Sequence, residues 1–161
     1  MTDKAANTQV YRIVIKASAQ AIWDAITKPE WTERYAYEGR VKYDLKPGGK
    51  YHHEASPDMK AVGLPEVVVV GEVLESDPPR KLVQTWHPLF TPEMIAEPPS
   101  RLTYEIVEGS GVCTVTIIHD VTGAPLVGGM VKGGGDPAKG GGGWPWVLSD
   151  LKSLLETGKR M

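Results

Sequence analysis

The sequence predicts an α+β domain in which a curved antiparallel sheet of about seven strands surrounds one long C-terminal helix. Three observations lead to this fold class. Short runs of alternating apolar and polar residues recur over the first 120 residues, as in strands with one buried face. Pro- and Gly-rich turns separate these runs at hairpin spacing. The last segment changes to helical periodicity, and its apolar side needs a large surface to cover it.

The first elements follow directly from local signals. Residues 1–8 are polar and are expected to form a flexible N-terminus, so that a single domain spans 9–158. Alternation predicts a strand over 10–15. Ser18 is a helix N-cap candidate before apolar residues at helical spacing, and Pro29 ends that helix. A short second helix is then expected from Pro29 to Tyr35.

Six further strands are expected in the middle of the chain. They are predicted near 41–45, 51–55, 67–74, 82–87, 102–106 and 112–119. The connection around Pro57, Gly63 and Pro65 is predicted to be a loop. Residues 88–100 carry four prolines and are interpreted as an excursion without regular structure. A Gly-rich loop is expected at about 121–143, since nine of the 18 glycines lie between Gly128 and Gly143.

The C-terminal segment predicts an amphipathic helix. Val147, Leu148, Leu151, Leu154 and Leu155 recur at helical spacing over about three turns. The sheet is the only predicted surface large enough to cover this apolar side. Pro145 suits the first turn, where its missing N–H costs nothing, and Gly158 is typical of a helix terminator.

The composition limits which cellular compartment and which classes of partner are expected. The chain has 161 residues, with 18 Lys and Arg against 20 Asp and Glu, so nothing favours nucleic acid or an anionic membrane as a partner. No targeting or membrane-spanning segment is visible, and the single cysteine, Cys113, excludes an internal disulfide. We therefore expect a cytoplasmic protein.

Most motifs of phosphate-binding, metal-binding or catalytic sites are not matched, because the residues do not have the required spacing. Lys139 precedes Gly140 without a following Lys-Ser or Lys-Thr pair, so the glycine cluster is not a phosphate-binding loop. His52 and His53 are adjacent and point to opposite faces of a strand, and no H-E-x-x-H motif follows. Cys113 lies in an alternating strand and is interpreted as a buried small residue. We expect neither a metal nor a cofactor.

The same segments, taken in order, resemble a known family. They are YRIVIKASAQAIWDAITKPEWTERY (11–35), KPGGKY (46–51), GEVLESDPPRKLVQTW (71–86), TVTIIHD (114–120) and GGWPWVLSDLKSLLETG (142–158). Together they resemble the SRPBCC (START-like) superfamily, and more narrowly its branch named after the C-terminal domain of the heat-shock (Hsp90) ATPase activator. The resemblance implies a helix-grip fold with a cavity between a seven-stranded sheet and the C-terminal helix.

The resemblance implies that the protein binds a small apolar or amphipathic molecule in a cavity. It does not imply one particular reaction. Members of the superfamily include lipid and hormone carriers, polyketide cyclases and aromatases, and co-chaperone domains, and no invariant catalytic set carries over. The Gly-rich segment at 121–143 departs from the usual pattern. We expect it to border the entrance of the cavity and to be the most mobile internal part of the chain.

Strand alternation and the predicted helices nominate the ligand-binding residues. The candidates are Trp31, Tyr35, Tyr43, His53, Trp86, Tyr104, His119, Leu148 and Leu151. His53, His119 and Tyr104 could hydrogen-bond a ligand or move a proton, although each could also be an ordinary core residue.

Three functions therefore stay open. The first is a protein that binds a small apolar or amphipathic ligand. The second is a cyclase, aromatase or dehydratase that uses His53 or His119 as acid or base. The third is a co-chaperone that stimulates a chaperone ATPase. A homodimer formed by pairing of sheet edges is also open.

Overall fold

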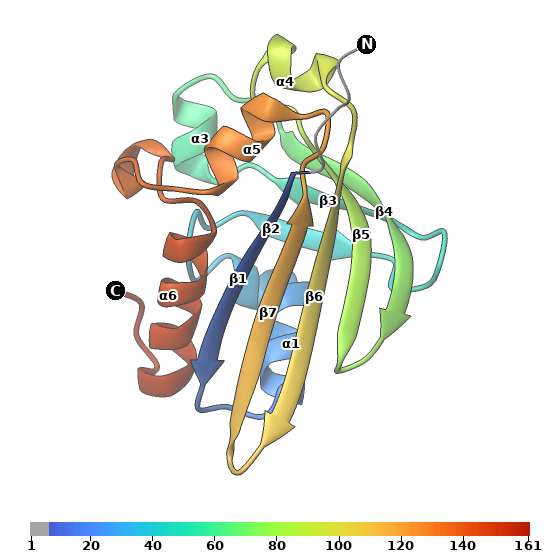
Figure 1. The fold of residues 1–161 in the computed structure, drawn as a ribbon. Coiled ribbons are helices and arrows are strands. Elements are labelled where there is room, and N and C mark those ends of the chain that lie inside the picture. The colour runs from blue at the N-terminus through green and yellow to red at the C-terminus, as the bar shows by residue number, and fades with distance from the viewer. Residues whose placement is uncertain (1–6) are drawn as a thin grey trace.

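Seven antiparallel strands form one curved sheet in the computed structural model, which describes residues 7–161 (Figure 1). The strands are β1 (Thr8–Ile15), β2 (Arg40–Tyr43), β3 (Lys50–Glu54), β4 (Val67–Asp77), β5 (Lys81–Pro88), β6 (Ser100–Gly109) and β7 (Val112–Asp120). Their order in the sheet is β1-β7-β6-β5-β4-β3-β2. This architecture confirms the predicted α+β class. The expected flexible segment at 1–8 lies mostly outside the described residues, and β1 begins at Thr8, inside it.

Within residues 7–161, six α-helices and one short 3₁₀ helix accompany the sheet. They are α1 (Ala19–Thr27), α2 (Pro29–Thr32), α3 (Pro57–Ala61), α4 (Pro92–Ala96), α5 (Pro125–Val131), η1 (Pro137–Lys139) and α6 (Gly143–Thr157). Figure 1 shows α6 running alongside β1, with α3, α4 and α5 gathered at one end of the molecule. As predicted, the Ser18 hydroxyl caps α1 by accepting from the Ala21 N–H at 3.1 Å, and Gly158 ends α6 in a left-handed conformation with φ of 78°.

Three segments for which the sequence predicts loops or irregular structure contain helices. The connection after β3 holds α3, the Pro-rich excursion holds α4, and the Gly-rich segment at 121–143 holds α5 and η1. Each of these helices starts with a proline in its first turn, where the missing N–H is harmless. They have three to seven residues, so they are too short to produce the periodic pattern on which the prediction relied.

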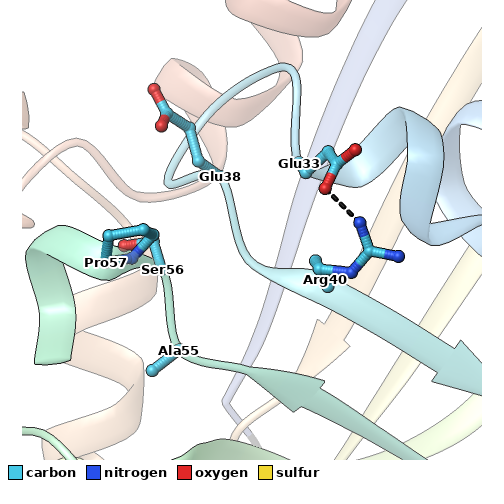
Figure 2. Close-up of a pocket in the computed structure, with 6 residues that line it drawn as sticks. All are labelled: Glu33, Glu38, Arg40, Ala55, Ser56 and Pro57. Atoms are coloured by element: carbon cyan, nitrogen blue, oxygen red, sulfur yellow. Dashed lines mark hydrogen bonds and ion pairs between the residues drawn. The ribbon is translucent and has the colours of Figure 1, made fainter.

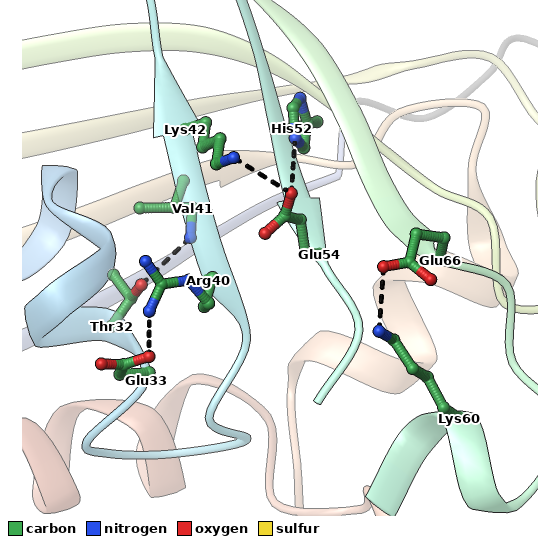
Figure 3. Close-up of polar contacts among 9 residues, drawn as sticks. All are labelled: Thr32, Glu33, Arg40, Val41, Lys42, His52, Glu54, Lys60 and Glu66. Carbon is green, nitrogen blue, oxygen red and sulfur yellow. Dashed lines mark hydrogen bonds and ion pairs between the residues drawn. The ribbon is translucent and has the colours of Figure 1, made fainter. Parts of the chain in front are cut away.

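The helix α2 is shorter than predicted and ends at Thr32 instead of Tyr35. The chain after it turns sharply, because Ala36 and Glu38 both adopt left-handed backbone conformations, with φ of 54° and 60°. Such a conformation costs a residue with a Cβ roughly 1–2 kcal/mol. Thr32 joins α2 to the sheet, since its hydroxyl accepts from the Val41 N–H of β2 at 3.1 Å (Figure 3).

The helix α6 buries one face against the sheet and α1. Trp144, Leu148, Leu151 and Leu154 are all buried in the main core together with the inner residues of β5, β6 and β7. Burial of side chains of this size contributes roughly 1.5–3 kcal/mol each. The core therefore depends on where this helix lies.

A buried hydrogen-bonded chain fixes the start of α6 to the sheet. The Trp144 Nε1–H donates to His119 Nδ1 at 3.0 Å, and His119 Nε2 lies 2.7 Å from Ser100 Oγ. Because indole can only donate, His119 carries its proton on Nε2 and donates it to Ser100. The Ser100 hydroxyl then donates to the Trp86 carbonyl at 2.9 Å. This chain links α6 to β7, β6 and β5.

A second buried group joins the middle of α6 to the loop at 35–39. The Asp150 carboxylate is fully buried and accepts from the Ala36 N–H and the Met161 N–H, each at 2.7 Å. Its Oδ2 also lies 3.0 Å from the Arg160 guanidinium. Arg160 in turn donates to the Ala36 carbonyl at 2.9 Å and pairs with Glu38. These contacts hold the two left-handed residues in place.

Replacing Asp150 tests this second attachment. In Asp150→Ala, the buried donors around the carboxylate lose their acceptor, so the free energy of unfolding should fall by about 2–4 kcal/mol in urea denaturation. Ser149→Ala, at the exposed neighbouring position, should stay within about 0.5 kcal/mol of the wild type. Equal effects of the two substitutions would contradict the attachment.

The His119 chain predicts a pH dependence. Burial lowers the pKa of His119 to about 4 and outweighs the nearby Asp120 carboxylate, which raises it. In the unfolded chain His119 binds its proton near pH 6.5. The contribution of the neutral buried ring to the free energy of unfolding is therefore complete above that pH and is lost as the pH falls toward 4. His119→Gln should therefore reduce the stability difference between pH 7 and pH 5 by about 2 kcal/mol, measured by urea denaturation at both values. An unchanged difference would show that His119 is not buried as a neutral ring.

Candidate binding pocket

A pocket of about 1020 Å³ lies between the inner face of the sheet and α6. Side chains from β3 to β7 form its floor, α6 forms one wall, and α3, α5, η1 and the loop at 35–39 surround the rest. Apolar residues from these elements make up much of the lining: Ile26, Met59, Val62, Leu64, Val68, Val69, Phe90, Val115, Ile117, Met130, Val131, Val147, Leu148 and Leu151. The pocket is thus a largely apolar space in the position that the sheet and α6 define.

Six of the nine candidate residues line this pocket. They are Tyr35, His53, Trp86, Tyr104, Leu148 and Leu151. The other three, Trp31, Tyr43 and His119, contribute to the surrounding structure but are not among the lining residues. Trp31 is half-buried against the core, with the Arg34 guanidinium 4.6 Å from its ring centre.

The hydrogen bonds and burial of His119 determine whether it can act as an acid or base. Both ring nitrogens are engaged, one by Trp144 and the other by Ser100, and the side chain is fully buried. A ring without a free lone pair toward a ligand cannot act there as a general base. The geometry therefore gives His119 a positioning role for α6 and Trp144.

Tyr43 and Gln84 form a polar group next to the pocket. The Tyr43 hydroxyl donates to Gln84 Oε1 at 2.8 Å, and the Tyr43 ring stacks on Tyr51 with centroids 4.8 Å apart. The close packing of Tyr51 requires Gly71, because a Cβ at that position would lie 2.4 Å from the Tyr51 ring. Gln84 is fully buried, and its Nε2 has no hydrogen-bond partner in the described part of the chain.

His53 and His52 face opposite sides of β3, as strand alternation predicts. His53 lines the pocket, whereas His52 lies with Lys42 around the Glu54 carboxylate on the other face (Figure 3). Burial, together with a smaller effect of the neighbouring His52, lowers the pKa of His53 to about 4. His53 is therefore neutral at physiological pH and is the one histidine among the lining residues.

The charged residues of the lining are Glu38, Asp58, Lys139 and Arg160. Three of them are exposed to solvent, and Arg160 is paired with Glu38 and Asp150. A smaller pocket of about 260 Å³ shares Glu38 and Ser56 with the large one and also contains the Glu33–Arg40 ion pair (Figure 2). Charge is therefore concentrated around the opening and not on the floor.

Sequence reasoning missed the residues that frame the opening. Met59, Val62 and Met130 lie on or beside α3 and α5, which the sequence analysis interpreted as loops. No sequence signal marked Ala36 and Glu38 as left-handed. The Gly-rich segment does border the pocket through residues such as Lys139, Gly140 and Gly143. Gly142 and Gly143 are sterically required, since a Cβ would lie 2.4 Å from Trp146 or from the Gly133 nitrogen respectively.

Residues 7–161 contain neither a candidate metal-binding cluster nor a candidate membrane-spanning helix. No group of three or more His, Cys, Asp or Glu side chains in that range could hold a metal ion. None of the helices there is both long enough and apolar enough to cross a bilayer.

Comparison with solved structures places this architecture among known folds. CalU16 from Micromonospora echinospora superposes with a TM-score of 0.64 at 20% identity, covering 95% of this chain and 78% of that crystallised chain. PFC0360w, an HSP90 activator from Plasmodium falciparum, superposes with a TM-score of 0.54 at 19% identity, covering 70% and 71%. MLL2253 from Mesorhizobium loti has a TM-score of 0.66 at 20% identity, covering 93% and 97%. At these identities the similarity shows a shared fold.

Sequence comparison identifies the family itself. No curated protein matches the chain. The family model described as activator of Hsp90 ATPase homolog 1-like protein matches residues 16–156, which run from the end of β1 into the last turn of α6. Its helix-grip fold is the seven-stranded sheet around α6 described above. The chain therefore belongs to the family of activator of Hsp90 ATPase homolog 1-like proteins.

Proposed function

We propose that this protein binds a small hydrophobic or amphipathic molecule in the pocket between the sheet and α6. The observation that carries the proposal is the pocket itself, a space of about 1020 Å³ with a largely apolar lining and few polar groups. Sites of this size and composition are typical of small-molecule binding. The polar groups on its inner surface, His53 and Tyr104, would orient a ligand whose body is held by apolar contacts.

The arrangement of charge favours an apolar or amphipathic molecule. A ligand on the floor would lie among apolar side chains and uncharged rings, while any charged group would find partners only near the opening, at Glu38, Asp58, Lys139 or Arg160. An ion buried without a partner carries a large desolvation penalty. The apolar end of an amphipathic ligand would thus point inward.

Binding accounts for the site better than catalysis does. A cyclase or dehydratase needs an acid or base within reach of the substrate. Both ring nitrogens of His119 are hydrogen-bonded, to Trp144 and Ser100. The pKa of His53 is lowered to about 4, mainly by burial, so near pH 7 its ring is a weak base and lacks the extra proton of a general acid. His53 is then the single histidine through which the enzymatic alternative could work, and His53→Gln should not abolish binding of an apolar probe.

A co-chaperone role is the second candidate, because PFC0360w is an HSP90 activator with the same fold. The direct test is the ATPase rate of purified Hsp90 with and without this protein. Stimulation that survives filling of the pocket would establish a function separate from ligand binding, and an unchanged ATPase rate would remove this candidate.

Filling the pocket should abolish binding. Val147 lies on α6, is half-buried and lines the pocket, so Val147→Trp should occupy ligand space and weaken binding of the neutral apolar dye Nile red at least about tenfold. The matched control is Val107→Trp, at a position that is 66% exposed and outside the pocket lining, and it should change the affinity less than about twofold. Fluorescence titration measures both, with thermal unfolding as the check on folding.

The same two variants test whether the pocket holds a natural ligand. Native mass spectrometry of the wild-type protein, purified without added ligand, should detect a bound small molecule that Val147→Trp lacks and Val107→Trp retains. Equal dye binding by all three proteins, together with the absence of a bound species, would contradict the proposed function.

A further inference from the structure

One tyrosine hydroxyl in the pocket has no hydrogen-bond partner among residues 7–161. The chain has six tyrosines, and within residues 7–161 five of their hydroxyls take part in hydrogen bonds. The hydroxyl of Tyr104 makes none with the described residues, although Tyr104 lines the pocket. A phenol in an apolar setting normally finds a partner, so this hydroxyl is free for a group that enters the pocket.

The surroundings of Tyr104 are aromatic. It lies on β6 opposite Leu82 of β5 and Ile117 of β7. Its ring meets Trp144 edge to face, with centroids 6.1 Å apart and an interplanar angle of 88°, and Trp144 lies 6.5 Å from Trp86. All three rings line the pocket. Flat rings of this kind favour a planar, aromatic ligand body through stacked and edge contacts.

Electrostatics decides what Tyr104 can recognise. Burial raises the pKa of its hydroxyl well above the ordinary value, and the Tyr43 and Tyr35 phenols raise it further. The hydroxyl therefore keeps its proton and can donate it in a hydrogen bond. Among residues 7–161, the cations of the lining are Lys139, which is exposed, and Arg160, which is paired with Glu38 and Asp150, so neither is available on the inner surface. A carboxylate beside Tyr104 would lack a cation, whereas a neutral acceptor needs none.

We infer that the pocket selects an uncharged, planar aromatic ligand with a carbonyl oxygen, and that Tyr104 donates a hydrogen bond to that oxygen. This inference rests on the proposed binding function and adds the class of ligand. Tyr104 is then a specificity-determining residue: it distinguishes an oxygen-bearing ring system from the corresponding hydrocarbon and from the corresponding acid.

Three probes of one ring shape test the inference: fluorene, 9-fluorenone and fluorene-9-carboxylate, each titrated by isothermal calorimetry against wild type, Tyr104→Phe and Tyr11→Phe. Tyr104→Phe removes only the hydroxyl. A neutral hydrogen bond corresponds to roughly a three- to tenfold change in affinity, so 9-fluorenone should bind Tyr104→Phe weaker by about that factor. Fluorene should bind both proteins within about twofold, and the carboxylate should bind the wild type weakest of the three.

Tyr11→Phe is the matched control, because the Tyr11 hydroxyl donates to Gln9 and Tyr11 is not among the lining residues. It should leave all three affinities unchanged. Fluorene affinity also reports whether Tyr104→Phe keeps an intact pocket.

The possible outcomes distinguish a failure of this inference from a failure of the proposed binding function. If none of the probes binds the wild type, the proposed function and this inference both fail. If fluorene binds but Tyr104→Phe leaves 9-fluorenone unaffected, or if the carboxylate binds tighter than the ketone, the inference alone is overturned. A loss confined to 9-fluorenone in Tyr104→Phe supports it.

Discussion

The hydrogen bond from the Trp144 indole to His119 sets where α6 lies on the sheet, and the pocket depends on that position. The bond is made in the core at 3.0 Å, and it joins the first turn of the helix to the end of β7. Ser100 completes the arrangement by binding the other ring nitrogen. Because buried polar groups are costly when unpaired, each member of the chain constrains the next. The same bonding removes His119 from any direct role with a ligand.

The middle of α6 is held differently, and this leaves room for the pocket. Asp150 and Arg160 fasten the left-handed turn at Ala36 and Glu38, so that the loop at 35–39 forms part of the lining. Between these two attachments the inner side of α6 presents Val147 and Leu148 to the pocket, and Leu151 follows directly after Asp150. The polar groups that attach α6, at His119, Ser100 and Asp150, are thus paired within the protein, whereas the Tyr104 hydroxyl has no hydrogen-bond partner among residues 7–161. That difference separates structural polar residues from those available to a ligand.

The sequence indicated the sheet and α6 because both repeat: alternation marks strands such as β6 and β7, and Leu148, Leu151 and Leu154 mark one face of a helix. It also placed His53 and Tyr104 on the correct side of their strands. It could not find α3, α4 or α5, because helices of five to seven residues have fewer than two turns, too few for a repeating apolar pattern to be recognised. Nor could it separate His119 from His53, since both lie on inward strand positions and differ only in partners contributed by distant segments.

The most direct test of ligand binding between the sheet and α6 is a crystal structure of the protein soaked or co-crystallised with an aromatic ketone such as 9-fluorenone. We expect density for one molecule between the inner face of the sheet and α6, flanked by Trp86 and Trp144, with its oxygen within hydrogen-bond distance of the Tyr104 hydroxyl. The position of α6 should be unchanged, because its attachments at His119 and Asp150 do not involve the ligand. A molecule bound only on the outer surface, with the pocket between sheet and helix filled by water alone, would show that this pocket does not bind the ligand.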